Sequence, residues 1–263
     1  MRISGRSEGT ARAAGEADFR HWPGRFGPPQ DCVMRTPPSY ETRHGACDLL
    51  HTHRHDGAYA ALVVDGSHIE VSPDGPIECV PGTLLLHPRW HTHGNRFGRH
   101  GARVVNIALA TGLAGDGLHV LRVANVKEAQ AMFVRAPHRL GELIAAGMPA
   151  ERLALPAWQT TFLHELEHGD LDISVLARYA GVSLAHVSRS FRKSHGMPPQ
   201  LLRRELRCRR ALRLLDSGRG LADIAALSGF ADQAHLSRTL RAATGATPSQ
   251  LRRQVKSVQD AGR

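Results

Sequence analysis

The stretch "AHLSRTLRAATGATPSQLRR", from Ala234 to Arg253, decides how the last third of the chain folds, because an earlier stretch repeats it. The earlier copy, "AHVSRSFRKSHGMPPQLLRR", runs from Ala185 to Arg204 at an offset of 49 residues. Upstream of the two copies, "ISVLARYAGVS" (173–183) corresponds to "LADIAALSGFAD" (221–232) at an offset of 48. Repetition of this kind indicates that one supersecondary unit occurs twice.

Each copy has the pattern of a helix, a short turn and a second helix. In the first copy, apolar residues at helical spacing lead to Gly181, which gives the turn its freedom in φ. Ser183 suits the N-cap of a second helix whose Val187 and Phe191 bury one face. A small-residue turn between two such helices is typical of the helix-turn-helix, whose second helix enters the major groove of DNA. The corresponding residues of the second copy are Gly229, Asp232, Leu236 and Leu240.

The outward faces of the two second helices carry the candidate DNA contacts. Arg189 and Arg238 fit bidentate contact with guanine, at about 1–3 kcal/mol of discrimination each. Arg192 and Arg241 lie nearer the helix flank and fit contact with phosphate. Each of these arginines could instead be a solvated surface charge. The repeated unit as a whole could instead be a helical hairpin repeat that contacts protein. Such a repeat usually needs at least three copies, so two copies favour DNA. The predicted DNA-binding residues are Ala185, His186, Ser188, Arg189, Arg192, Gln233, Ala234, His235, Ser237, Arg238 and Arg241.

The segment between the copies, from Pro198 to Gly218, predicts one long helix. Prolines suit its start and Gly218 its end, and its leucines can face a core while several arginines stay in solvent. A rigid helix would fix the distance between the two reading units. Recognition helices in successive major grooves on one side of a duplex lie roughly 34 Å apart. The predicted target is therefore two unlike short DNA elements about one turn apart, bound by one chain.

The distribution of charge along the chain also indicates that its last third binds DNA. The 263-residue chain has a formal net charge of +10. Residues 171–256 contain 16 Lys and Arg and 5 Asp and Glu, whereas the rest contains 18 basic and 19 acidic residues. One compact third therefore carries the whole excess of positive charge. Such a field attracts a polyanion, and nucleic acid is the commonest polyanion in a cytosol.

Residues 171 to 256 resemble the DNA-binding domain of the AraC/XylS family of bacterial transcription regulators. The resemblance is carried by the tandem arrangement and by "GFADQAHLSRTLRAATGATPSQLRR" (229–253). It implies a sequence-specific, cytoplasmic transcription regulator rather than an enzyme, with promoter DNA as target and with RNA polymerase and a second copy of the chain as candidate partners. Ala185 and Ala234 stand where the family has larger side chains, so readout there reduces to thymine methyl contact. Leu240 replaces a usual Phe.

From Asp48 to Ala110 the sequence predicts short strands. "YAALVVDGSHIEVS" (59–72) indicates two strands around an Asp65-Gly66 turn. "VPGTLLLHPRWHTH" (80–93) and "RVVNIAL" (103–109) indicate further strands. Strands separated by Gly and Pro turns predict a small barrel or jelly roll. The expected fold is thus α+β with two domains, an N-terminal β-barrel with linking helices and a C-terminal all-α tandem helix-turn-helix.

Histidines are concentrated in this predicted barrel. Nine of the 17 histidines lie between His44 and His100. In "HTHRHDGAYAALVVDG" (51–66), His51, His53 and His55 alternate, so a strand would direct all three imidazoles to one face. Neutral imidazoles at this spacing suit Zn²⁺, Ni²⁺, Cu²⁺ or Fe²⁺.

The same stretches resemble the cupin barrel that precedes the DNA-binding domain in many such regulators. The resemblance puts the metal-binding histidines of cupins at His53, His55 and His93, with His51 and His91 as further candidates. Tyr59 stands where metal-binding cupins have a glutamate. A metal site, a metal-free effector pocket that uses some of these histidines, and histidines without a ligand all stay open. No cofactor is required, a divalent transition metal is a candidate, and a cupin metalloenzyme with a DNA-binding appendage is the alternative function.

The remaining segments complete the predicted domain organisation. Residues 1–30 form a flexible tail, 31–124 the sensing barrel, 125–168 linking or dimerisation helices, 169–256 the DNA-binding domain and 257–263 a C-terminal tail. The four cysteines form no CxxC pair, and no apolar run approaches the roughly 20 residues of a membrane span. Neither a zinc knuckle nor a membrane partner is therefore expected, and the location is expected to be the reducing cytosol.

Overall fold

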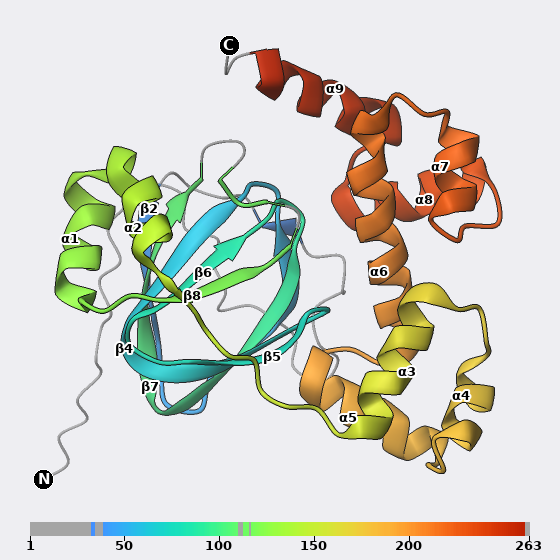
Figure 1. Ribbon diagram of the computed structural model, residues 1–263, viewed down its shortest axis with the longest axis horizontal. Helices are drawn as coiled ribbons and strands as arrows, with labels where there is room; N and C mark the ends of the chain where they lie inside the picture. Colours follow the sequence, from blue (N-terminus) through green and yellow to red (C-terminus); the bar gives the residue numbers. More distant parts are fainter. Residues whose placement is uncertain (1–32, 35–38, 110–112, 116, 261–263) are drawn as a thin grey trace, which may run out of the picture.

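The structure is a computed structural model that describes residues 33–34, 39–109, 113–115 and 117–260. The predicted N-terminal tail, residues 1–30, lies outside the described residues. The described chain has two parts, a strand-rich barrel and a helical domain beside it (Figure 1). The predicted fold class, a β-barrel with linking helices followed by an all-α domain, is confirmed.

The barrel is one strongly curved sheet, antiparallel except for the β1–β3 pair. Its order is β1-β3-β7-β4-β6-β8-β9, with β2 paired to β7 and β5 paired to β4. The long strands β4 and β7 bend, so each contributes to two sides of the barrel. The strands of the described residues are β1 (Val33–Met34), β2 (Ser39–His44), β3 (Leu49–His55), β4 (Tyr59–Ser72), β5 (Gly75–Cys79), β6 (Thr83–His87), β7 (Thr92–Ala108), β8 (His119–Arg122) and β9 (Met148–Pro149).

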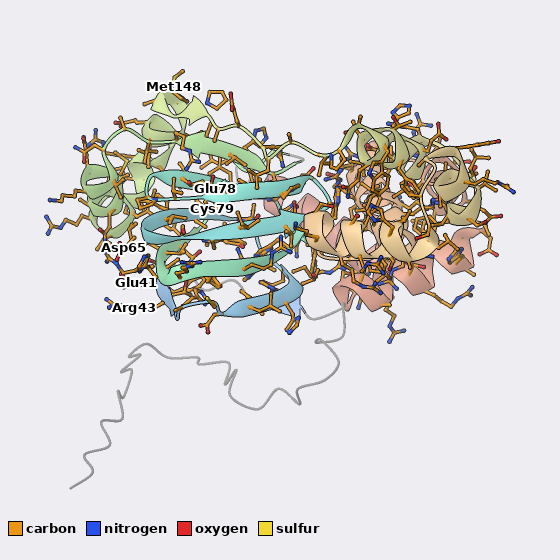
Figure 2. All side chains as sticks on the ribbon, turned by 90° about the horizontal axis from the view of Figure 1, so that it is seen from below. Glu41, Arg43, Asp65, Glu78, Cys79 and Met148 are labelled. Carbon is orange, nitrogen blue, oxygen red and sulfur yellow. The ribbon has the colours of Figure 1, made fainter. Side chains whose placement is uncertain are left out.

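The predicted hairpin turn at Asp65-Gly66 is wrong. Both residues lie inside β4, where the pairing with β7 shifts register on either side of them. Gly66 has φ of 70°, and a Cβ there would lie 2.1 Å from the carbonyl oxygen of Gly101. The dipeptide that suits a two-residue turn therefore forms a bulge that bends a continuous strand. Asp65 lies at the end of the sheet that is distant from the helical domain (Figure 2).

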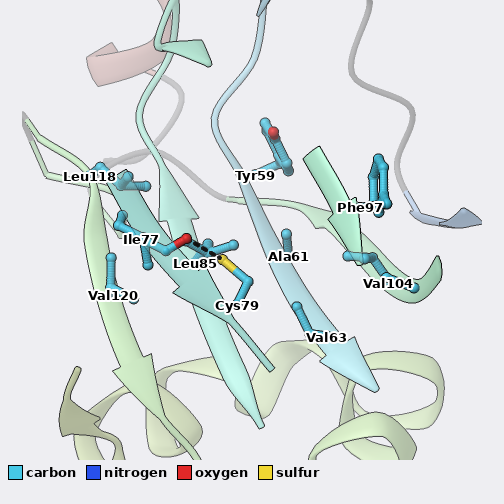
Figure 3. Close-up of a cluster of buried hydrophobic side chains, with 11 residues drawn as sticks. Tyr59, Ala61, Val63, Ile77, Cys79, Leu85, Phe97, Val104, Leu118 and Val120 are labelled. Atoms are coloured by element: carbon cyan, nitrogen blue, oxygen red, sulfur yellow. Dashed lines mark hydrogen bonds between the residues drawn. The ribbon is translucent and has the colours of Figure 1, made fainter. Parts of the chain in front are cut away.

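Successive side chains along the strands point alternately into and out of the barrel and so contribute to two separate apolar cores. Ala61 and Val63 of β4 point into the barrel and pack with Leu85 and Ile77, as Figure 3 shows. The intervening residues Ala60 and Leu62 point outward and are covered by Phe133 and Leu140. These two residues belong to α1 (Val126–Arg135) and α2 (Leu140–Ala146), which are joined by the 3-10 turn η2 (Pro137–Arg139). The barrel is thus filled on the inside and capped by two helices on one outer face.

The predicted linking region, 125–168, is divided in the structure. Its first helices, α1 and α2, pack on the barrel, whereas α3 (Ala157–His168) packs with the helical domain. Phe162 and Leu166 of α3 share a core with Val187 and Phe191. The two parts therefore meet at the extended segment 150–156 rather than at residue 168. The difference arises because an amphipathic helix does not reveal from its own sequence which neighbour covers its apolar side.

The helical domain has the predicted duplicated design. The first unit consists of α4 (Ile173–Tyr179) and α5 (Leu184–His195), and the second of α7 (Leu221–Leu227) and α8 (Gln233–Thr244). The joining segment is α6 (Pro199–Leu214) with the 3-10 turn η3 (Leu215–Ser217), and α9 (Pro248–Asp260) extends into the predicted C-terminal tail. Figure 1 shows α6 running from the first unit to the second.

The local features that the sequence assigned to the two units are present. Gly181 and Gly229 adopt φ of 67° and 76° in the turns. The side chain of Ser183 accepts a hydrogen bond from the His186 backbone N–H, and Asp232 accepts one from that of His235. Each unit has its own apolar core, which contains the predicted residues Val187, Phe191, Leu236 and Leu240. Among the described residues, no helix is long and apolar enough to cross a membrane.

Candidate nucleic-acid interface and histidine site

The predicted DNA contacts lie on the outer faces of α5 and α8. Arg189, Arg192, Arg238 and Arg241 are all exposed, and Arg192 donates a hydrogen bond to the Ser188 hydroxyl. The small and polar positions between the arginines are accessible as well, because Ala185, Gln233 and Ala234 are exposed while Ser188 and Ser237 are half-buried. Two amphipathic helices of 12 residues each thus present cationic, small-residue faces to solvent.

His186 and His235 have a second role besides the predicted DNA contact. The His186 ring lies 5.5 Å from that of Trp158 on α3, and the His235 ring lies 5.3 Å from that of Phe230. The backbone N–H of each histidine also donates a hydrogen bond to the N-cap side chain of its helix. They therefore support the starts of α5 and α8 through ring contacts with the domain's own aromatic side chains.

Inside the barrel, the predicted histidines come together. His53 and His55 of β3 and His93 of β7 are buried, and each offers a ligand nitrogen within 4.8 Å of the others. His53 and His93 are directly opposed in the pairing of the two strands. Tyr59 lies in the same group, with its hydroxyl 3.1 Å from His93 Nε2. The residue that replaces the expected glutamate therefore contacts a predicted ligand.

His51 does not join the cluster. The pairing of β3 with β7 shifts register between Leu50 and His53, so the alternation that the sequence suggested is interrupted there. The His51 side chain is exposed, and its carbonyl oxygen accepts a hydrogen bond from His53 Nδ1 at 2.8 Å. The prediction that three alternating histidines share one face is thus wrong for His51. Its backbone instead fixes the tautomer of His53 and leaves Nε2 of that ring without a proton.

Two residues that the sequence analysis missed extend the cluster. His87, the last residue of β6, forms a second candidate metal-binding group with His91 and His93. Glu70 of β4 is 1% exposed and lies 3.6 Å from His87 Nε2. Single histidine and glutamate residues inside apolar strand sequences give no periodic signal of their own. Only the strand pairing brings them to the same place.

Burial keeps these imidazoles neutral. It lowers the pKa of His53 to about 4 and that of His55 to about 3, and it takes the pKa of His87 and His93 well below the usual value. Burial also raises the pKa of Glu70 to about 8. Nδ1 of both His55 and His93 is buried without a hydrogen-bond partner. Neutral rings with unused lone pairs are the form of histidine that binds a metal ion.

The strands that carry the histidines also hold the helical domain. In β3, His53 and His55 face the cluster while Arg54 is directed to α6, where its Nη2 lies 2.8 Å from Glu205 Oε1. In β7, Thr92 donates a hydrogen bond to the other Glu205 oxygen at 2.8 Å. The Arg54 and Glu205 side chains are 1% and 8% exposed. A buried ion pair therefore joins the two domains one residue away from the histidines.

Further contacts flank this ion pair. Thr52 donates to the carbonyl oxygen of Gly196 at the end of α5, and Arg96 donates to that of Lys193. Trp90, in the loop from β6 to β7, packs against the core of the second unit. A cleft of about 200 Å³ remains between the domains, lined by residues that include Arg54, Trp90, Arg209 and Leu212. The first DNA-reading unit thus contacts the barrel directly through α5, and the second is connected to it through α6 and Trp90.

Comparison with known proteins supports the C-terminal assignment. Residues 176–254 match the family model described as a helix-turn-helix domain. No curated protein matches the chain. The chain is similar to ToxT from Vibrio cholerae with 11% identity, over 81% of this chain and 97% of that one, at a TM-score of 0.37.

Two further solved structures are each similar over about two fifths of the chain. A transcriptional regulator with an AraC-type DNA-binding domain from Chromobacterium violaceum is 29% identical over 38% of this chain and 96% of its own, with a TM-score of 0.32. The C-terminal domain of AraT, a response regulator from Geobacillus stearothermophilus, is 27% identical over 40% and 88%, with a TM-score of 0.36.

The match to the domain family confirms the predicted helix-turn-helix DNA-binding domain, which is of the AraC type. A DNA-binding transcription regulator is the class of protein that this domain defines.

Proposed function

We propose that this chain is a one-component transcription regulator, in which the barrel senses an effector and the helical domain binds two adjoining elements of a promoter. One observation carries the proposal: the two helix-turn-helix units expose equivalent cationic faces, and the domain that contains them is docked through α5, α6 and Trp90 on a barrel that encloses a buried histidine cluster. An effector changes DNA binding only if its affinity differs between two arrangements of the domains. The contacts between the barrel and α6 are where such arrangements would differ.

The test is a footprint of the purified chain on the DNA upstream of its own gene, with and without added divalent metals. We expect protection of two short elements about one helical turn apart on one face of the duplex. A footprint that changes when divalent metal is added would support the proposal that the effector is a metal ion. Binding without sequence preference at physiological salt would contradict the proposal.

The residues of the first histidine group fit a transition metal. His53, His55 and His93 supply three neutral imidazoles, as in sites with three protein ligands and an open position. Tyr59 contacts His93 and does not supply the carboxylate that a cupin enzyme uses. A metal bound there would act as an effector, because it would fix β3 and β7, the two strands that hold Glu205.

Metal analysis of the purified protein tests this assignment. We expect one transition metal ion per chain in the wild type. In a His91→Ala background, which disables the second histidine group, the His53→Ala/His55→Ala double change should abolish binding with the helical domain still folded. A folded, metal-free wild type under metal-replete conditions would exclude a resident metal. It would favour an organic effector in the cleft between the domains, whose lining includes the cations Arg54 and Arg209. Neither result affects the DNA-binding assignment.

A cupin metalloenzyme with a DNA-binding appendage is the alternative function. It would need an open metal site together with a substrate-facing acid or base.

RNA polymerase and a second copy of the chain are the protein partners that we propose for a promoter-bound activator. Cross-linking on promoter DNA would detect both.

A further inference from the structure

We propose that His87, His91 and His93 form a cation site of their own, and that its occupancy is coupled to docking of the DNA-binding domain through Asp74 and Arg209. The three rings are buried, and each offers a nitrogen within 4.8 Å of the others. This inference rests on the proposed function, since it names how the barrel regulates DNA binding. The group shares only His93 with the triad that the sequence resemblance indicates.

The rings of His87 and His91, which lie outside the first triad, face each other through their Nδ1 atoms. Nδ1 of His87 lies 3.2 Å from Nδ1 of His91. In a tetrahedral site with Zn–N bonds of about 2.0–2.1 Å, two ligand nitrogens lie roughly 3.3–3.4 Å apart. The observed separation therefore suits one cation bound by both rings. Without a cation, one Nδ1–H donates a hydrogen bond to the other Nδ1.

A carboxyl group stands behind each of the two rings. His91 Nε2 lies 2.9 Å from Asp74 Oδ2, and His87 Nε2 lies 3.6 Å from Glu70 Oε2. A metal-binding histidine typically donates its second N–H to a carboxylate, which fixes the tautomer and directs the other nitrogen to the metal. With Nε2 of His91 protonated by its contact with Asp74, the Nδ1 lone pair of His91 is directed toward Nδ1 of His87.

Asp74 is shared with the DNA-binding domain. Its second oxygen, Oδ1, accepts a hydrogen bond at 2.7 Å from Nη1 of Arg209 on α6. The side chains of Asp74 and Arg209 are 18% and 24% exposed, so this contact is largely shielded from solvent. The chain of contacts therefore runs from His91 through Asp74 to the helix that joins the two DNA-reading units.

The same three histidines enclose the loop from β6 to β7, which also contacts the DNA-binding domain. Trp90 in this loop has φ of 65°, a conformation that is rare for a bulky side chain. Its N–H donates to the His55 carbonyl oxygen at 3.0 Å, its ring packs on the core of the second unit, and the Arg89 guanidinium lies 5.0 Å from the ring. A cation on His87, His91 and His93 would tie both ends of this loop together.

Cobalt(II) titration of the apoprotein tests the site. The d–d absorption of a tetrahedral Co²⁺ complex reports the ligand set directly. Because each histidine group is complete without the other's first two residues, the test uses His55→Ala, in which the first group has lost a ligand. We expect one Co²⁺ per chain in His55→Ala and loss of the spectrum in His55→Ala/His91→Ala. Loss of the spectrum in His55→Ala alone overturns the proposal, as does a folded wild type that binds no Co²⁺.

A second variant covers the case in which His91→Ala does not fold, as judged by circular dichroism. Asp74→Asn keeps the shape of the side chain but removes its charge. In the His55→Ala background, we expect it to weaken Co²⁺ binding by roughly 10–100-fold, as for other carboxylates behind metal-bound histidines. An affinity equal to that of the wild type would contradict the role of Asp74.

Limited proteolysis of the segment 150–156 tests the coupling. Zn²⁺ should slow cleavage of this connection in the wild type, because it strengthens docking, and it should do so equally in Arg213→Ala. Arg213 is an exposed residue of α6 one turn beyond Arg209 and serves as the matched control. In Arg209→Ala, Zn²⁺ should no longer slow cleavage. Equal protection of Arg209→Ala and the wild type would refute the coupling, whereas DNA footprints would still test the proposed function separately.

Discussion

Arg238 is the residue at which the DNA-binding assignment is most directly measurable. It is exposed on α8, at the position equivalent to Arg189 on α5. A guanidinium that contacts guanine bidentately contributes about 1–3 kcal/mol of discrimination. Arg238→Ala should therefore weaken specific binding by this amount and relax the preference at one base pair, measured by titration against a set of operator variants. Arg135→Ala, exposed on α1 of the barrel, should change neither quantity. Unchanged specificity in Arg238→Ala would refute base contact.

Arg192 should behave differently from Arg238. It lies one turn beyond Arg189, near the end of α5, and its side chain is exposed beside Ser188. A phosphate contact contributes to all sequences alike and releases about one counterion. Arg192→Ala should lower affinity for specific and random DNA equally and reduce the slope of log K against log salt by about one. A loss confined to the specific site would instead indicate base contact.

Two buried histidines outside the proposed metal groups make stability depend on pH. Burial lowers the pKa of His68 to about 3 and that of His195 to about 4. Because these values lie below the ordinary value of 6.5, the unfolded chain binds more protons in acid. The stabilisation is complete above pH of about 6.5 and is lost as the pH falls, by about 2 kcal/mol per histidine at pH of about 5.

The variant His68→Gln tests this dependence. Between roughly pH 7 and pH 5, the free energy of unfolding of its barrel should fall by about 2 kcal/mol less than that of the wild type. Chemical denaturation at the two pH values measures the difference. His100→Gln, at an exposed position of β7, should retain the wild-type dependence. An equal dependence in His68→Gln and the wild type would mean that His68 does not titrate as its burial implies.

At the scale of elements, the start of each recognition helix depends on one capping side chain. Asp232 accepts a hydrogen bond from the His235 N–H at 2.6 Å, and Ser183 accepts one from that of His186 at 3.2 Å. Loss of an N-cap costs about 0.5–2 kcal/mol. Asp232→Ala should lower the stability of the second unit by this amount in thermal unfolding, while Asp232→Asn, which retains a capping oxygen, should stay close to the wild type. Equal losses in both variants would show that charge rather than capping matters.

At the scale of the whole molecule, the Arg54–Glu205 pair governs how the two domains dock. Removal of one partner from a buried ion pair leaves an uncompensated charge and costs about 3–5 kcal/mol. Glu205 can regain water if the domains separate, so Arg54→Ala should favour separation more than unfolding. Small-angle scattering should report a larger radius of gyration. Arg43→Ala, whose side chain is 78% exposed on the barrel, should leave it unchanged. A compact Arg54→Ala variant would show that other contacts suffice.

The local order of the DNA-binding domain follows from the sequence. Its helices, turns and caps depend on interactions within about four residues, and a 49-residue repeat writes the same pattern twice. The roles expected for Gly181, Ser183 and Asp232 are therefore present as predicted. The same locality explains why His53 and His55 were found, since two residues two apart on one strand share a face.

Long-range pairing accounts for what the sequence did not reveal. The exposed position of His51 and the bend at Asp65-Gly66 come from register shifts against β7, a strand that begins more than 25 residues later. The attachment of α3 to the DNA-binding domain, and the meeting of Asp74 with Arg209, join residues that no local pattern relates. Strand register and domain docking depend on which surfaces fit together in three dimensions, and a one-dimensional pattern records that a face is apolar or charged but not which partner covers it.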